Sequence, residues 1–208
     1  MSREIHVRFC EGAGVKLPRA TRLILCFQYK EDAERVRGVL DKRFARFGLS
    51  LHPEKTRLIE FGRFAAQNAI RRGEGKPATF DFLGFTHLCA RSRRGKFTIH
   101  VRTMRKRLKR SSKQVSAWCQ VHRHDPVERQ CEVLNSKLRG HYQYYGRPTN
   151  YRSLRVYYRL VRRIWQKWLN RRTRGKTLHW HAYAQLLDRH PLLQPYIARP
   201  WVGAGSRT

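Results

Sequence analysis

Acidic side chains are scarce in this sequence. Its 208 residues include 14 Asp and Glu against 46 Lys and Arg, which gives a formal net charge of +32. The imbalance grows along the chain, since residues 1–95 contain 20 basic and 10 acidic side chains, whereas residues 96–208 contain 26 and 4. Repulsion at this density opposes compaction unless a polyanion screens it. Most of the cations are arginines, which suit bidentate contact with phosphate. We therefore expect a nucleic acid partner.

Long apolar runs are also lacking. No segment has the ~18 consecutive apolar residues that a transmembrane helix needs. The N-terminal sequence MSREIHVRFCEGAG has no apolar core of the kind that marks a signal peptide. These absences predict a cytoplasmic protein without a membrane partner.

Paired cysteines are the third absence. The five Cys are scattered, odd in number and without paired spacing, which indicates reduced and mostly buried thiols. Cys119, His122, His124 and Cys131 have the spacing C-x2-H-x-H-x6-C, whereas zinc sites commonly use C-x2–4-C or H-x3–5-H pairs. Because this set does not match and both cysteines fit apolar helix stripes, we expect no metal and no other cofactor.

The first half of the chain has the pattern of a small sheet with one helix. Residues 1–22 show no period and contain Gly and Pro, so we expect them to be irregular. After them the sequence predicts strands over residues 23–27, 56–61, 80–89 and 96–102, a helix over residues 31–47 that Gly48 ends, and an exposed excursion over residues 63–79.

Beyond Thr103 the apolar period becomes helical. Apolar stripes predict helices over residues 104–119, 127–145, 154–168 and 179–187, with Asp125 as an N-cap and Pro126 at a first helical position. The domains we expect are 1–22, irregular and degenerate; 23–101, the small sheet; 102–190, a helical bundle; and 191–208, a tail.

Three motifs occur in a fixed order. GLSLHPEKTRLIEFGR (Gly48–Arg63) joins a turn to a strand, and FDFLGFTH (Phe80–His87) follows after residues 64–79. GHYQYYGRPTNYRSLR (Gly140–Arg155) places helices on either side of a Gly-Arg-Pro turn. Together they resemble the late palm and the maturase-specific domain of reverse transcriptases encoded by bacterial group II introns. The resemblance covers residues 23–200.

The resemblance implies an α+β fold in a C-terminal fragment: a small residual palm sheet with one packed helix, then an all-α thumb and maturase helical bundle. The family's catalytic Tyr-Ala-Asp-Asp box would stand where this chain reads RATR, with Thr21 and Arg22 at the aspartate positions. Polymerases hold Mg²⁺ with carboxylates, and Arg would repel it. We therefore expect no catalytic residue in this chain, and Mg²⁺ only in an intact family member.

Two further positions correspond to polymerase elements. Lys55 stands where the family has a lysine near the incoming nucleotide, and a solvated turn lysine is the alternative. Phe82-Leu83-Gly84 resembles the primer grip, and a core strand whose Gly permits a bend is the alternative. Without the aspartates, all these positions would be vestigial.

Aromatic residues among arginines suit stacking on unpaired bases together with phosphate contact. Tyr142, Tyr145 and Tyr158 have the alternative role of packing the core of a helical bundle. The residues we predict to contact nucleic acid are Arg105, Lys106, Arg107, Lys109, Arg110, Arg139, Tyr144, Arg147, Tyr151, Arg152, Arg155, Arg159, Arg162, Arg163 and Lys167.

Three functions compete at this point. The first is an RNA-binding maturase fragment that assists the folding and splicing of group II intron RNA, with DNA as a second candidate ligand. The second is the C-terminal part of a split reverse transcriptase, completed in trans by an N-terminal fragment. The third is a non-functional relic of a mobile element.

Overall fold

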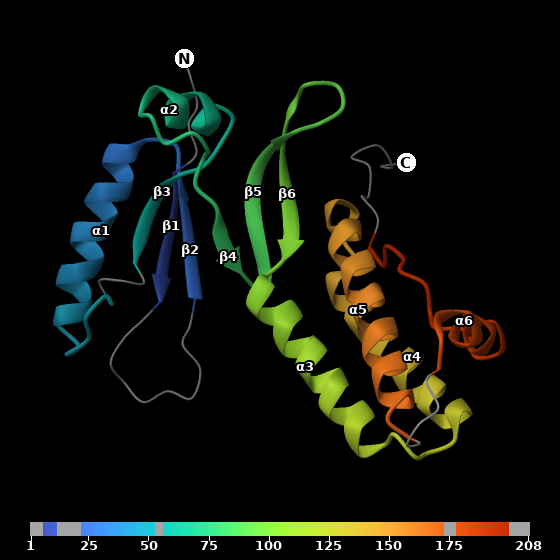
Figure 1. The fold of residues 1–208 in the computed structure, drawn as a ribbon. Helices are drawn as coiled ribbons and strands as arrows, with labels where there is room; N and C mark the ends of the chain where they lie inside the picture. The colour runs from blue at the N-terminus through green and yellow to red at the C-terminus, as the bar shows by residue number, and fades with distance from the viewer. Residues whose placement is uncertain (1–5, 12–21, 53–55, 173–177, 200–208) are drawn as a thin grey trace, which may run out of the picture. The chain divides into compact units, whose positions relative to one another are not determined.

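The computed structural model describes residues 6–11, 22–52, 56–172 and 178–199, with side chains from residue 24 onwards. The fold is mixed α and β, and the described residues form two three-stranded sheets and six α-helices (Figure 1). The chain divides into two compact units, residues 1–100 and 101–208. The sequence placed this boundary one residue later, between 101 and 102.

The first sheet has the order β2-β1-β3 and is antiparallel throughout. Strand β1 (His6–Glu11) lies between β2 (Arg22–Phe27) and β3 (Arg57–Glu60). The expectation that residues 1–22 are irregular is wrong for β1, because pairing on both sides, rather than a local pattern, makes this strand. Helix α1 (Lys30–Ala45) contacts β1 and β2, as the prediction of one helix packed on the sheet required.

The second sheet has the order β4-β5-β6, with β4 (Phe80–Phe82), β5 (Phe85–Arg91) and β6 (Phe97–Thr103). The predicted single strand over residues 80–89 is therefore wrong. Leu83 and Gly84 both have positive φ, 46° and 82°, and the chain reverses there so that Phe82 pairs with Phe85. Positive φ at both central positions is typical of a tight hairpin turn.

The segment predicted to be an exposed excursion contains helix α2 (Ala65–Arg71). Ala65 and Ala69, four residues apart, are buried, which is the spacing of one helix face. Two small side chains leave little apolar signal in the sequence, so the helix was missed. The core of this unit is small, and its buried centre is Ile59 and Phe61.

The second unit contains every helix that the sequence predicted there. These are α3 (Arg105–Val121), α4 (Val127–Tyr145), α5 (Tyr151–Leu169) and α6 (Trp180–Arg189), with a short 3₁₀ turn, η1 (Pro148–Asn150). Pro126 stands one position earlier than predicted, at the N-cap of α4. The Asp125 carboxylate binds His122 Nδ1 at 2.9 Å and does not cap the helix. None of the described helices is both long and apolar enough to cross a bilayer.

Residues 191–199, predicted to belong to a tail, pack on the helical unit. Leu192 is buried in its core, and the Tyr142 hydroxyl donates to the Leu193 carbonyl at 3.1 Å. Asn135 accepts from the Leu193 N–H at 2.7 Å, and Arg199 N–H donates to the Gly146 carbonyl at 3.0 Å. The sequence does not mark this segment because it has no helical period, and hydrogen bonds to residues far away in the sequence hold it.

A buried amide connects three helices of this unit. The Asn150 side chain is fully buried; its Oδ1 accepts from the Thr103 N–H at 2.9 Å, and its Nδ2 donates to Thr103 Oγ1 and to the Tyr145 carbonyl at 2.9 and 2.8 Å. We name Thr103, Tyr145 and Asn150 the junction. Thr103 stands just before the N-cap of α3, Tyr145 ends α4, and Asn150 is the N-cap of α5. The junction therefore holds the N-termini of α3 and α5 next to each other.

We predict that Asn150→Ala lowers the free energy of unfolding by about 3 kcal/mol, because it leaves the buried N–H and hydroxyl of Thr103 without the amide partner, at ~1–3 kcal/mol each. Urea denaturation of the whole chain measures this. Gln143→Ala, at an exposed position of α4, is the matched control and should change stability by less than ~0.5 kcal/mol. A loss below ~1 kcal/mol for Asn150→Ala would show that water replaces these contacts.

A histidine also lies in this core. The His141 ring stacks on Tyr157 with 3.7 Å between ring centroids, and only 8% of the residue is exposed. Its Nε2 is buried and has no hydrogen-bond partner among the described residues. Burial lowers the pKa of His141 to about 4, because the charged ring would lose its hydration. The ring is therefore neutral at pH 7 and acts as a packing group.

This burial predicts a loss of stability in mild acid. The pKa of His141 is ~6.5 in the unfolded chain and about 4 in the folded one. At a pH between these two values, His141 binds a proton in the unfolded chain only, so lowering the pH favours unfolding. The free energy of unfolding should therefore fall by about 2 kcal/mol from pH 7 to pH 5. His141→Phe keeps an aromatic ring that cannot bind a proton, so it should remove this loss of stability in acid. The exposed His181→Phe should leave it in place. Equal pH profiles for the wild type and His141→Phe would contradict the assignment.

Candidate nucleic-acid interface

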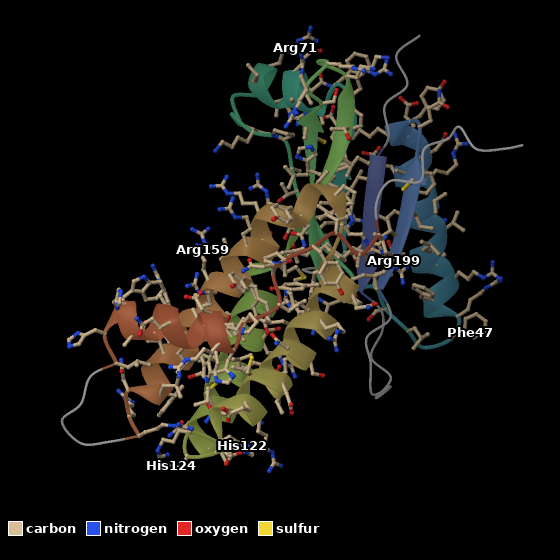
Figure 2. All side chains as sticks on the ribbon, turned by 90° about the vertical axis from the view of Figure 1, so that its right-hand side faces the viewer. Phe47, Arg71, His122, His124, Arg159 and Arg199 are labelled. Atoms are coloured by element: carbon tan, nitrogen blue, oxygen red, sulfur yellow. The ribbon has the colours of Figure 1, made fainter. Side chains whose placement is uncertain are left out.

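Helix α5 separates an apolar face from a cationic face. Its buried residues include Leu154, Tyr157, Val161 and Trp165, which recur at helical spacing on one side. The opposite side presents exposed cations at successive i,i+4 positions: Arg155, Arg159, Arg163 and Lys167. Figure 2 shows Arg159 directed away from the bundle.

A row of this kind destabilises an isolated helix. Like charges at i,i+4 cost ~0.2–0.5 kcal/mol per pair, and α5 contains no carboxylate that could offset them. Among the described residues, no cation of this row forms an ion pair. A bound polyanion would turn this repulsion into attraction.

Helix α3 begins with a second group of exposed cations. Arg105, Lys106 and Arg107 occupy its first turn, where the helix dipole favours anions, and no acidic residue stands there. Lys109 and Arg110 continue the group and are also exposed. Phosphate groups at this end would meet both the positive helix terminus and the side chains.

The junction brings the two groups together. It holds the first turns of α3 and α5 next to each other, and the two helices pack on one another in the same direction (Figure 1). The end of α4 adds Tyr144, which is 53% exposed, and α5 begins with Tyr151, which is 43% exposed. One end of the bundle thus combines cations from α3 and α5 with accessible aromatic rings.

The tyrosines of the motif divide into two groups. Tyr142 and Tyr158 are buried in the core, and Tyr145 packs against it, so the core alternative considered from the sequence holds for all three. Tyr144 and Tyr151 keep exposed surface for stacking. The remaining predicted contacts Arg139 and Arg152 are exposed as well.

Arg147 and Arg162 are only partly exposed. The Arg162 guanidinium lies over the rings of Trp180 and Tyr158, at 5.1 and 5.7 Å from their centroids, and its Nε is buried without a partner among the described residues. Arg162 thus supports Trp180, which is 54% exposed at the start of α6. Sequence reasoning missed Trp180, and its place beside two histidines (HWH) at a helix start was the available signal.

Four of the six positions matched to polymerase elements lie within the described residues. Thr21 and Lys55 lie outside the described residues, and Arg22 begins β2. Phe82 ends β4, while Leu83 and Gly84 form the hairpin turn and Leu83 is 61% exposed. Within the described part of the chain, no three His, Cys, Asp or Glu side chains are grouped closely enough to hold a metal ion.

The set tested for zinc has other roles. Cys119 and Cys131 are buried, and burial raises the pKa of the Cys119 thiol to about 12. His122 stacks on Trp118 and binds Asp125, whereas His124 is exposed. Among the other described cysteines, Cys89 is half-buried and Cys26 is exposed, which departs from the expectation of burial.

No family model matches this chain, and no curated protein matches it.

We predict that Arg159→Glu stabilises the protein in the absence of nucleic acid. In the wild type, Arg159 repels Arg155 and Arg163, whereas a glutamate at position 159 would attract both. This change should raise the free energy of unfolding by about 1 kcal/mol at low salt. Arg159→Gln should give about half of the gain, and ~0.5 M salt should remove most of it. Thermal or urea unfolding measures the effect, and a less stable Glu variant would show that the arginine row is structurally required.

Proposed function

We propose that this chain is an RNA-binding protein whose helical unit grips the phosphate backbone of a structured RNA. The observation that supports this most directly is the arrangement of exposed cations on α3 and α5, two helices that contain no carboxylate. Exposed Tyr144, Tyr151 and Trp180 would stack on unpaired bases. Exposed cations beside accessible aromatic rings suit a folded RNA with splayed nucleotides.

The motif resemblance narrows the proposal to group II intron RNA. We infer that the chain is a maturase fragment, with a palm remnant in residues 23–101 and a thumb and maturase bundle in residues 102–190. It would assist the folding and splicing of the intron in the cytoplasm. The intron ribozyme supplies the splicing chemistry, so a protein that only binds and positions RNA needs no catalytic group and no metal of its own.

One observation favours a second candidate, the C-terminal part of a split reverse transcriptase. Ala33 is the single buried residue of α1, while Val39 on this helix and Phe47 just after it are 56% and 71% exposed. Exposed apolar residues on a helix are typical of a surface that another polypeptide covers. An N-terminal fragment with its own Asp-Asp box is the partner that this candidate requires.

The first test is binding of the purified chain to its neighbouring group II intron RNA at ~0.2 M salt, against an unrelated structured RNA and a DNA duplex of equal length. We expect clear preference for the intron RNA. Equal, weak and salt-erased binding to all three would leave only a generic polycation, and the relic hypothesis would replace the proposal.

A triple variant tests which surface binds. Replacing Arg155, Arg159 and Arg163 by Gln should reduce the slope of log K against log salt by about 2 to 3, since each lost phosphate contact accounts for ~0.7–0.9. Replacing the exposed α1 residues Arg37, Lys42 and Arg43 by Gln removes the same charge and should change the slope by less than ~1. Equal effects of the two variants would move the RNA surface away from α5.

A further inference from the structure

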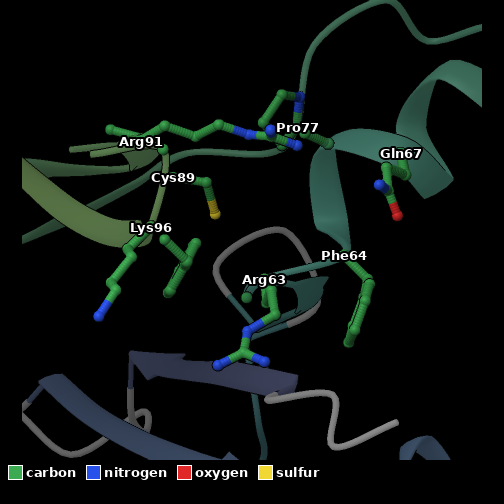
Figure 3. Close-up of a pocket in the computed structure, with 12 residues that line it drawn as sticks. Arg63, Phe64, Gln67, Pro77, Cys89, Arg91 and Lys96 are labelled. Atoms are coloured by element: carbon green, nitrogen blue, oxygen red, sulfur yellow. The ribbon is translucent and has the colours of Figure 1, made fainter. Parts of the chain in front are cut away.

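The first unit contains a pocket of about 740 Å³ that residues between 62 and 97 line (Figure 3). Its walls come from the segment before α2, from α2 itself, and from the hairpin of β5 and β6. This volume lies within the ~300–1,000 Å³ of small-molecule sites. The described residues that line the pocket all belong to the first unit.

The pocket is cationic. Arg63 comes from the segment before α2, while Arg91 and Lys96 come from the β5–β6 hairpin, and none of the described residues that line the pocket is acidic (Figure 3). The nearest carboxylates in sequence, Glu60 and Glu74, bind Arg72 at 2.5 and 2.9 Å. In the described part of the chain, none of the three lining cations forms an ion pair, so their charge is available to an anion.

The pocket also offers flat apolar surface. Phe64 and Phe97 line the pocket and are half-buried. Part of each side chain packs against the protein, and the rest is accessible to a ligand. The Cys89 sulfur is directed into the hollow (Figure 3). Cations that hold a phosphate, beside rings that accept a base by stacking, are the combination by which proteins bind single-stranded nucleic acid without reading its sequence.

We propose that this pocket binds one nucleotide, with its phosphate held by Arg63, Arg91 and Lys96 and its base stacked on Phe64 or Phe97. The ligand is either a free nucleotide or one unit of a single strand. This site is independent of the RNA surface on α3 and α5, and either site can fail in experiment while the other stands.

Cys89 provides a local readout in the full chain. We would measure its alkylation rate by peptide mass spectrometry, in mildly alkaline buffer because burial raises the pKa of this thiol. A uridine decamer should slow alkylation of Cys89 at least ~3-fold and leave the exposed Cys26 unchanged. The measurement is made in the full-length variant in which Arg155, Arg159 and Arg163 are replaced by Gln, so that RNA binding on α5 contributes little. Equal slowing of both cysteines, or none, would overturn the proposal.

Two ligand controls identify the source of the chemistry. If uridine monophosphate protects Cys89 as strongly as the decamer does, the pocket binds free nucleotides. If only the decamer protects Cys89, the pocket binds one unit of a strand. Inorganic phosphate or a decamer of glutamate that protects as strongly would overturn the role of the base.

A matched pair of variants completes the test. Arg91→Gln with Lys96→Gln should weaken the protection at least ~5-fold, because two phosphate contacts are lost. Arg93→Gln with Arg94→Gln removes the same charge from the turn of the same hairpin, at exposed positions outside the pocket lining, and should change it by less than ~2-fold. Equal effects of the two pairs would mean that only the net charge of the hairpin acts.

Discussion

The buried amide of Asn150 is the contact on which the helical unit depends. It satisfies the buried N–H and hydroxyl of Thr103, for which no other partner is described, and it donates to the last carbonyl of α4, which also accepts from the Arg147 N–H. Because hydrogen bonds are directional, this contact also sets the position of α3 relative to α5. Apolar packing in the bundle tolerates small shifts, whereas the amide requires its partners in one place.

This constraint has an electrostatic consequence. It places two helix N-termini together, each without an acidic residue in its first turn, and cations of α3 and α5 then share one end of the bundle. The arrangement opposes folding stability, since like charges and helix dipoles repel each other there. A polyanion relieves all of these costs at once, which is why the geometry favours a binding function over a structural one.

The two units differ in how they could serve that function. The helical unit has a large core of aromatic and aliphatic side chains, in which Gln130 and Trp165 are both buried and hydrogen-bonded to each other at 2.8 Å. The first unit has a small core around Ile59 and Phe61 and carries most of its charge on exposed side chains. A well-packed helical platform suits recognition of a folded RNA, while a cationic pocket suits a single nucleotide.

Local sequence patterns specify the four helices of the second unit, their apolar faces and their cationic faces. Those features depend on residues three or four positions apart, so local periodicity encodes them. Tyr142 and Tyr144, two residues apart, could not be assigned in this way, because only packing decides which ring is buried. Tertiary packing instead produces the pairing of β1 and the docking of residues 191–199. Each of these depends on hydrogen bonds or contacts between segments that the chain brings together only on folding. The same is true of Asn150: its side chain acts through residues 47 positions away, and no local pattern marks it.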